Sequence, residues 1–237
     1  MAIDMHQFYR LLCLTFLFTG LLISCEEAPP EILVEIPDKA FLQVLIDLGV
    51  DTNNDGQISQ EEAEAVSTIT IPPSGINDLT GLEAFTRLDS LTITLNPLSG
   101  IDLSGNGALR YLECTHCELG SLDISGNPEL EELICDRNQL RELNTSSNPS
   151  LIKLSCKNNL LSSLDLSANT GLTKMVSCGN QLSRLDISML PALTVIGVDN
   201  MPMLTEVCVW TLPFPPEDVT VIMGFSPNIN FITSCNW

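Results

Sequence analysis

The chain has 237 residues and a formal net charge of −20 at pH 7. Such an acidic balance argues against nucleic-acid binding, because neutralising phosphates requires clustered lysine and arginine, whereas it suits cation binding. Aromatic residues make up only 5% of the chain, so composition does not indicate a surface on which sugars would stack.

The N-terminal segment has the features of an export signal. Residues 11–23 form an apolar run that is shorter than the roughly 20 residues a membrane-spanning helix needs. We therefore predict a signal peptide over residues 1–24.

The end of this segment, Leu22-Ile23-Ser24-Cys25, resembles a bacterial lipobox. The resemblance implies that Cys25 is lipidated after cleavage and that the protein is exported. It would then be held at the outer membrane or cell surface by the lipid alone. The alternative is an ordinary secretory signal with a cysteine there by chance. Residues 25–37, rich in Glu and Pro, are predicted to be the lipid-anchored tether.

An acidic loop follows a short predicted helix. The helix spans Asp38 to Leu48, with Asp38 as its N-cap and Gly49 at its end. The spacing of the loop residues resembles a single EF-hand calcium loop, and the resemblance implies Ca²⁺ as cofactor. It implies as ligands Asp51, Asn53, Asp55, Gln57 through its carbonyl, Ser59 and Glu62. Ser59 and Glu62 also fit a helix capping box, which is compatible with a calcium loop. Residues 38–67 would form an EF-hand-like N-terminal cap.

From Leu88 to Val198 the chain repeats itself every 21 residues, with the unit L-x-x-L-x-C-x-x-N-x-L-x-x-L-D-x-S-x-N. One such coil cannot bury its apolar edge alone, whereas stacked coils share a continuous core. The first leucine column comprises Leu91, Leu112, Leu133, Leu154, Met175 and Ile196.

This pattern resembles the leucine-rich repeat family, and is nearest to short internalin-like repeats. The resemblance implies an α/β-type repeat solenoid over residues 68–210. It would have a parallel β-sheet on the concave side, an irregular convex side and a small helix–loop–helix cap. It also implies that the Asn column lies inside the solenoid, bonded to neighbouring coils.

After the regular coils, Leu204 follows Leu193 by 11 residues, which predicts a shortened coil. Residues 211–237, rich in Pro, are predicted to leave the pattern as a C-terminal cap. Cys208 and Cys235 are the two cysteines outside the repeats and the leader, and in an exported chain we expect them to form a disulfide.

One short motif suggests chemistry, but its context favours a structural role. Cys114, His116 and Cys117 resemble a C-x-x-C thiol or zinc site, yet they fall on a strand of the repeat, where the columns already account for both cysteines. The column of Asp102, Asp123, Asp165 and Asp186, each followed two residues later by Ser, is interpreted as turn chemistry rather than as a ladder of bound cations. We therefore expect no enzyme, and keep a thiol or zinc enzyme at the C-x-x-C motif as the alternative.

The outward positions of the strands are where a protein or peptide partner would bind. The candidate residues are Glu113, Thr115, His116, Ile134, Asp136, Arg137, Ser155, Lys157 and Asn158. The predicted function is a non-enzymatic surface lipoprotein that binds a partner through this face. An accessory scaffold in glycan or nutrient uptake is the alternative, which aromatic residues on the face would favour; the predicted face has none.

Overall fold

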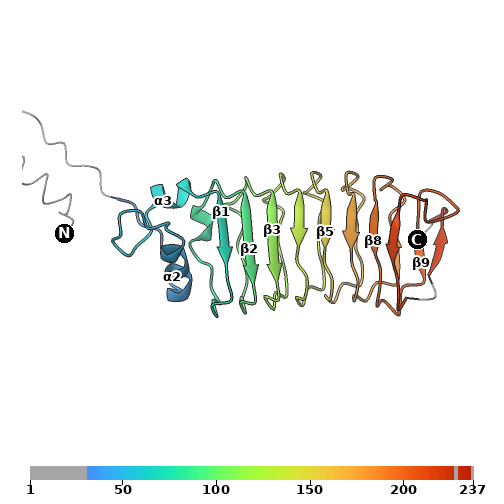
Figure 1. The fold of residues 1–237 in the computed structure, drawn as a ribbon, viewed down its shortest axis with the longest axis horizontal. Helices are drawn as coiled ribbons and strands as arrows, with labels where there is room; N and C mark the ends of the chain where they lie inside the picture. The colour runs from blue at the N-terminus through green and yellow to red at the C-terminus, as the bar shows by residue number, and fades with distance from the viewer. Residues whose placement is uncertain (1–30, 227–228, 236–237) are drawn as a thin grey trace, which may run out of the picture. The chain divides into compact units, whose positions relative to one another are not determined.

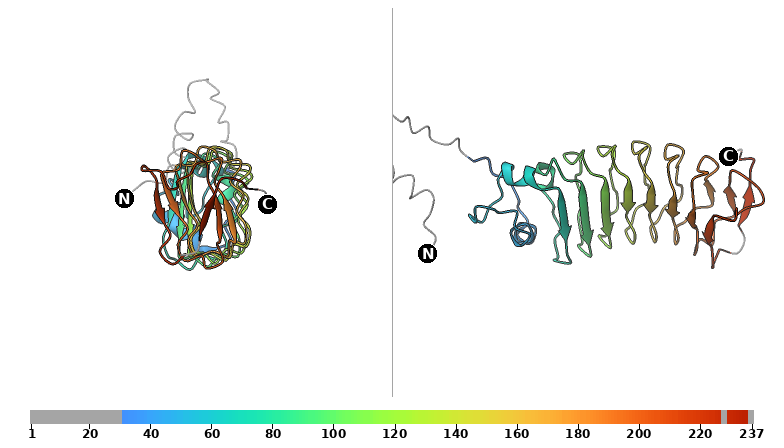
Figure 2. Two further views of the ribbon diagram at one scale, coloured as in Figure 1. Left: turned by 90° about the vertical axis from the view of Figure 1, so that its right-hand side faces the viewer. Right: turned by 45° about the horizontal axis from the view of Figure 1, so that its top comes forward.

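The computed structural model describes residues 31–226 and 229–235. The signal peptide and Cys25 lie outside the described residues. One compact unit begins at Ile32, and within it the chain winds in stacked coils behind a row of parallel strands (Figure 1). Viewed along the stack, successive coils project onto one another (Figure 2).

The first helix, α2 (Lys39–Asp47), forms where the sequence predicted it. Asp38 caps it by accepting hydrogen bonds from the backbone N–H groups of Ala40 and Phe41. Phe41, Val44 and Leu45 are buried, because their spacing puts them on one side of the helix. The helix thus covers the N-terminal end of the core.

The second helix, α3 (Gln60–Ala65), starts at the predicted capping box. The Ser59 side chain accepts the N–H of Glu62, and the Glu62 carboxylate accepts the N–H of Ser59. The helix lies against η1 (Leu82–Ala84), a short 3₁₀ turn of the first coil.

The main sheet has eight parallel strands. Its inward leucine column is in register, since Leu91 pairs with Leu112, Leu112 with Leu133 and Leu133 with Leu154. The repeat therefore stacks as predicted, and each fully buried leucine contributes roughly 1.5–3 kcal/mol. The strands are β1 (Thr68–Ile71), β2 (Ser90–Thr94), β3 (Tyr111–Thr115), β4 (Glu132–Ile134), β5 (Lys153–Ser155), β6 (Lys174–Val176), β8 (Val195–Gly197) and β10 (Thr220–Ile222).

A second sheet of three strands forms on the return side of the last coils. It consists of β7 (Arg184–Asp186), β9 (Glu206–Cys208) and β11 (Asn230–Ile232). The return side is therefore more regular here than predicted.

This second sheet corrects the prediction of a shortened coil. Val207 pairs with Leu185 on the return side, not with Ile196 on the main sheet. The 11-residue spacing is therefore half a coil. Residues 211–235 do not leave the pattern, because β10 continues the main sheet and β11 continues the second one. In this last coil the Phe214 ring contacts Trp210 edge to face, with 5.3 Å between the ring centroids, and contacts Phe231 at a tilt, with 4.8 Å between the centroids.

The asparagine column lies inside the solenoid, as the family resemblance implied. Asn138 Oδ1 accepts the N–H groups of Cys117 and Leu119 in the preceding coil, and its Nδ2 donates to the carbonyl of Cys114 at 2.6 Å. Each buried amide thus bonds to backbone N–H and C=O groups that would otherwise be buried in the turn without a partner. Asn96, Asn159 and Asn180 make equivalent bonds.

The structure also corrects the end of the predicted tether. Residues 32–36 belong to the folded unit: Leu33 forms an antiparallel bridge with Ser59, and Val34 and Ile36 pack against the core. Of the predicted 25–37 segment, only the part before this contact lies outside the unit that begins at Ile32.

Candidate functional site

The acidic loop is folded around the carboxylate of Asp51. Asp51 Oδ1 accepts the N–H of Asp55 at 3.2 Å, and Oδ2 accepts the N–H of Gly56 at 2.9 Å. Gly56 has φ +83°, a conformation that glycine adopts without strain. Asp51 itself is buried, so the sharp turn at Gly56 brings the loop backbone onto a carboxylate held in place.

Two further loop ligands are joined to this turn. Asn53 Oδ1 accepts the N–H of Asp55 at 2.9 Å, and Asp55 Oδ1 accepts the N–H of Gln57 at 2.9 Å. Both side chains are exposed. They are also bonded to each other, because Asn53 Nδ2 donates to Asp55 Oδ2 at 3.3 Å.

Glu62 closes the loop from its other end. Its Oε1 accepts the N–H and the hydroxyl of Thr52, at 2.7 and 2.8 Å, while Oε2 accepts the N–H of Ser59 at 2.9 Å. Burial raises the pKa of Glu62, but the hydrogen bonds from Ser59 and Thr52 outweigh that effect and lower the pKa to about 2. Glu62 is consequently ionised at neutral pH.

The donor set consists of oxygen atoms only, as a hard cation such as Ca²⁺ requires. In the described part of the chain, the carboxylates of Asp51, Asp55 and Glu62 do not form a group with one oxygen of each within 4.8 Å of the others. These three carboxylates are therefore not gathered at one point, and Glu62 is bonded to Ser59 in the capping box.

The loop is tied to the segment before α2. Val34 donates its N–H to the carbonyl of Ile58 at 2.8 Å, and Gln60 donates to the carbonyl of Ile32 at 2.7 Å. Ile58 is buried. An isolated antiparallel bridge between Leu33 and Ser59 thus holds the loop from outside, a contact that a tether over residues 25–37 does not predict.

The predicted partner-binding residues lie on the outer side of the main sheet or directly after its strands. Glu113, Thr115, Ile134 and Ser155 are half-buried on the sheet, because the side chains between them point inward. His116, Arg137 and Asn158 follow the strands and are exposed, each with positive φ between 53° and 56°. No described element lies across this face (Figure 1).

Asp136 is less available than the sequence suggested, with only 8% of its surface exposed. Its Oδ1 accepts the hydroxyl of Ser155 at 2.7 Å and the N–H of Lys157 at 2.8 Å, and its Oδ2 lies 3.0 Å from Lys157 Nζ. Its carboxylate is therefore bonded to residues of the next coil, and little of it is accessible to a binding partner.

The outer face of the main sheet also carries a tyrosine, Tyr111, which is not among the predicted partner-binding residues. Tyr111 begins β3, pairs in register with Glu132 and is half-buried. Its hydroxyl donates to Glu113 Oε2 at 2.9 Å; burial and this acceptor raise its pKa to about 12. The expectation of no aromatic residue on the face was therefore wrong by one residue.

The two cysteines of the C-x-x-C motif point into the core, away from its histidine. Cys114 and Cys117 are buried, whereas His116 is exposed. Burial raises the pKa of both thiols, so they remain protonated and unsuited to nucleophilic attack. Cys114 stands instead in a buried column with Cys135 and Cys156, and burial raises the pKa of Cys156 to about 12.

The aspartates of the Asp–Ser column form side-chain hydrogen bonds within turns, as predicted from the sequence. Asp102, Asp123 and Asp165 each accept the N–H of the serine two residues later at 2.9 Å. The bonds from Ser104, Ser125 and Ser167 lower the pKa of these exposed carboxyls.

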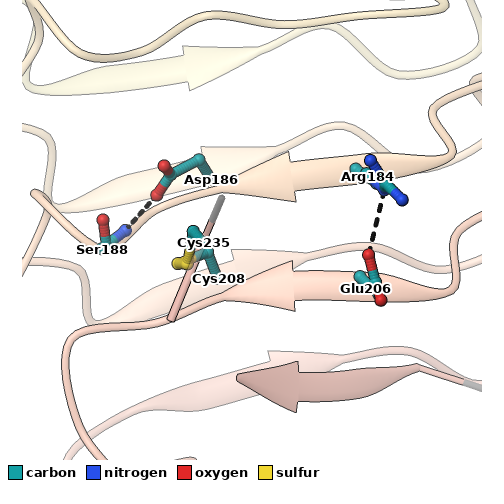
Figure 3. Close-up of a disulfide and its surroundings, with 6 residues drawn as sticks. All are labelled: Arg184, Asp186, Ser188, Glu206, Cys208 and Cys235. Carbon is teal, nitrogen blue, oxygen red and sulfur yellow. Dashed lines mark hydrogen bonds and ion pairs between the residues drawn. A yellow bond between two sulfur atoms is a disulfide. The ribbon is translucent and has the colours of Figure 1, made fainter. Parts of the chain in front are cut away.

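The predicted disulfide is present and joins Cys208 of β9 to Cys235 after β11, with 5.9 Å between the Cα atoms. Asp186 lies beside the disulfide on β7 (Figure 3). Within the described residues, Asp186, Cys208 and Cys235 form the only group of three side chains whose possible metal-ligating atoms lie within 4.8 Å of one another. Because both sulfurs are in the disulfide, this group is a crosslink with a neighbouring carboxylate and not a metal site. Arg184 and Glu206 form an ion pair on the adjacent positions at 2.9 Å.

No family model and no curated protein matches the sequence. Among solved structures, internalin C2 from Listeria monocytogenes str. 4b F2365 is similar, with 14% identity over 83% of this chain and 94% of that chain and a TM-score of 0.61. The fold is a leucine-rich repeat solenoid.

Two other solved structures were also matched. The functional domain of InlJ from Listeria monocytogenes, described as including a cysteine ladder, has 25% identity over 65% of this chain and a TM-score of 0.30. This chain spans 50% of the InlJ chain. A leucine-rich repeat protein of Leptospira interrogans has 14% identity over 73% of this chain and 55% of its own, with a TM-score of 0.48.

Within the described ranges, no helix is both long enough and apolar enough to cross a membrane.

Proposed function

We propose that this chain is a non-enzymatic binding protein that holds a protein or peptide partner on the outer face of its main sheet. The observation that carries the proposal is the face itself: eight parallel strands in register present half-buried and exposed side chains of both charges, with no described element across them. A surface of mixed polarity on a rigid scaffold suits recognition of another protein. The leucine-rich repeat fold supports this use, since the family is built around such faces.

A site-specific photo-crosslinker tests the proposal. Placed at Ser155, in the middle of the face, it should yield a discrete adduct in extracts of the native cells. Placed at Asn144, an exposed residue of the return side, it should not. Equal adducts at both positions, or none at Ser155, would count against binding through this face.

We further propose that the acidic loop holds one Ca²⁺ ion. Asp51, Asn53, Asp55, the carbonyl of Gln57, Ser59 and Glu62 would provide its oxygen ligands. The ion would neutralise the carboxylates that the loop concentrates, and would stiffen the cap of the solenoid. The support is the folded turn around Asp51, the positive φ of Gly56 and the purely oxygen donor set.

Thermal unfolding with calcium and with a chelator tests this site. A ligand at 100 times its dissociation constant stabilises the folded state by about 2.7 kcal/mol. Glu62→Gln should abolish the calcium-dependent rise in melting temperature, whereas Glu61→Gln, on the exposed side of α3, should retain it. Identical melting curves for the wild type with and without calcium would refute the site.

Anchoring through Cys25 remains a proposal from the sequence, as Cys25 lies outside the described residues. Cys25→Ala should release the protein from the membrane fraction and remove incorporated fatty acid. Unchanged fractionation would refute anchoring through Cys25.

A further inference from the structure

Basic residues are concentrated in one part of the chain. Residues 137–174 hold five of the ten lysines and arginines, with only Glu142 and Asp165 as acidic residues, in a chain of net charge −20. Four of the five basic residues are on or directly after the strands β4, β5 and β6 of the main sheet. We call these four the basic face: Arg137, Lys153, Lys157 and Lys174.

The burial pattern shows that the basic face points outward. Leu154 and Cys156 are 1% and 0% exposed, so the alternating neighbours Lys153, Ser155 and Lys157 lie on the other side of the strand. Lys153 pairs in register with Lys174 on the next strand. Two ammonium groups therefore stand on adjacent strands that are about 4.8 Å apart.

Among the residues that the structure describes, carboxylates form ion pairs with only two of the four residues of the basic face. Lys153 Nζ lies 2.6 Å from Glu132 Oε1, and Lys157 Nζ lies 3.0 Å from Asp136 Oδ2. Within the described residues, neither Lys174 nor Arg137 takes part in an ion pair. The in-register neighbour of Lys174 on β8 is Val195, which offers no carboxylate. An anionic partner would supply the missing charge.

A strip of two apolar residues with a serine between them runs between the two ends of this face. Ile134, Ser155 and Val176 are in-register neighbours on β4, β5 and β6. Ile134 is half-buried and Val176 is 8% exposed. Lys153 and Lys157 stand at either side of the strip, four residues apart along one extended segment, which is about 13 Å at the rise of a β-strand.

We propose that the basic face binds an extended acidic peptide lying along β5. In an extended chain, residues i, i+2 and i+4 point to the same side and span the same distance of about 13 Å. A segment with Glu or Asp at i and i+4 would place its carboxylates near Lys153 with Lys174, and near Lys157 with Arg137. An apolar residue at i+2 would contact Ile134 and Val176.

The same face is less suited to a uniform polyanion. Glu132 and Asp136 lie among the lysines, and an evenly charged phosphate or sulfate polymer would meet these carboxylates as well. It would also leave Ile134 and Val176 without an apolar partner. A peptide with two acidic residues separated by an apolar one meets neither penalty. The proposal rests on the sheet face being the binding surface, and it adds the chemistry of the partner.

Fluorescence anisotropy with a set of labelled peptides tests the proposal. The frame is Gly-Ser-X-Thr-Z-Thr-X-Ser-Gly, with X as Glu, Gln or Lys and Z as Leu or Ser. The Glu/Leu peptide should bind about ten-fold more tightly than the Lys/Leu peptide and more tightly than the Glu/Ser peptide, with an affinity that falls as salt is raised.

Matched charge reversals assign the binding to this face. The double variant Lys153→Glu/Lys174→Glu should lose the Glu/Leu peptide and bind the Lys/Leu peptide instead. The double variant Lys39→Glu/Arg87→Glu changes the net charge equally but lies on α2 and before β2, and should bind as the wild type does. A circular-dichroism melt confirms folding, and Lys153→Gln/Lys174→Gln replaces the reversal if the latter unfolds.

Three results would overturn the proposal: no binding by any peptide, equal binding of the Glu and Lys frames, or tighter binding of a ten-residue oligothymidylate or of heparin than of the Glu/Leu peptide. If the peptides fail while the crosslinker at Ser155 still captures a partner specifically, the acidic-peptide inference alone is wrong. If the crosslinker fails too, the binding face itself is wrong.

Discussion

Thr145 Oγ1 donates a 2.6 Å hydrogen bond to Oδ1 of Asn169, which lies in the next coil 24 residues later. Asn169 belongs to a second buried amide column, in which each Nδ2 donates to two carbonyls of the preceding coil. Within the described residues, the Oδ1 atoms of the three earlier members, Asn106, Asn127 and Asn148, have no hydrogen-bond partner. The positions that match Thr145 in the preceding coils carry Leu103 and Ile124, which have no hydroxyl.

Thr145→Val should therefore destabilise the protein although it preserves the shape of the side chain. The substitution leaves Asn169 Oδ1 buried without a donor, which costs about 1–3 kcal/mol. Urea unfolding measures the loss. Thr170→Val, at an exposed position of the same coil, is the control and should change stability by much less; equal effects of the two would show that the hydrogen bond is not what matters.

Cys117 occupies an asparagine position of the first amide column and makes the bonds of an asparagine through sulfur. Its Sγ reaches the carbonyls of Ile93 at 3.5 Å and Thr115 at 3.3 Å, and accepts the N–H of Asn96. Cys117→Asn should accordingly keep or raise stability, by about 1 kcal/mol, because an amide makes stronger bonds than a thiol. Cys117→Val should lower it, since the carbonyls lose their donor. A less stable Asn variant would mean that the coil has closed around the smaller thiol.

The spacing of apolar residues predicted the stacking of the coils, because a strict repeat leaves a single register in which Leu112, Leu133 and Leu154 can all be buried. The capping box of Ser59 and Glu62 was likewise predictable, since its two residues lie only three positions apart. Both features are local in the sequence or repeat at a constant interval.

The features that were mispredicted depend on contacts between coils. Val207 has the same apolar surroundings as a main-sheet residue, and only its pairing with Leu185 places it on the return side. Asp136 looks like an exposed strand residue until Ser155 and Lys157 of the next coil close over it. Residues 32–36 could have been found, because four of these five residues are apolar and Glu35 separates Val34 from Ile36 as in a half-buried strand.

Glu62 should make the stability of the calcium-free protein depend on pH. Its pKa of about 2 in the folded state lies below its ordinary value of 4.5, so the ionised form stabilises the fold. This contribution is fully present above pH 4.5 and is lost as the pH falls towards 2; its size is roughly 3 kcal/mol. Unfolding free energies measured in chelator should therefore converge for wild type and Glu62→Gln as the pH falls through this window. Parallel curves for the two proteins would contradict the assignment.

Removal of the disulfide should destabilise the last coil selectively. The crosslink encloses a sequence separation of 27 residues that contains both β10 and β11, and closing a loop of that length stabilises a fold by about 3 kcal/mol. In a solenoid each coil contacts only its neighbours, so the loss should stay local. Hydrogen exchange on Cys208→Ala/Cys235→Ala should show faster exchange in β10, β11 and β9, with β2 to β4 unchanged. Cys178→Ala, which removes a half-buried free thiol, is the control and should leave the last coil protected. If exchange rises equally along the whole solenoid, the coils unfold as one unit and the disulfide stabilises all of them.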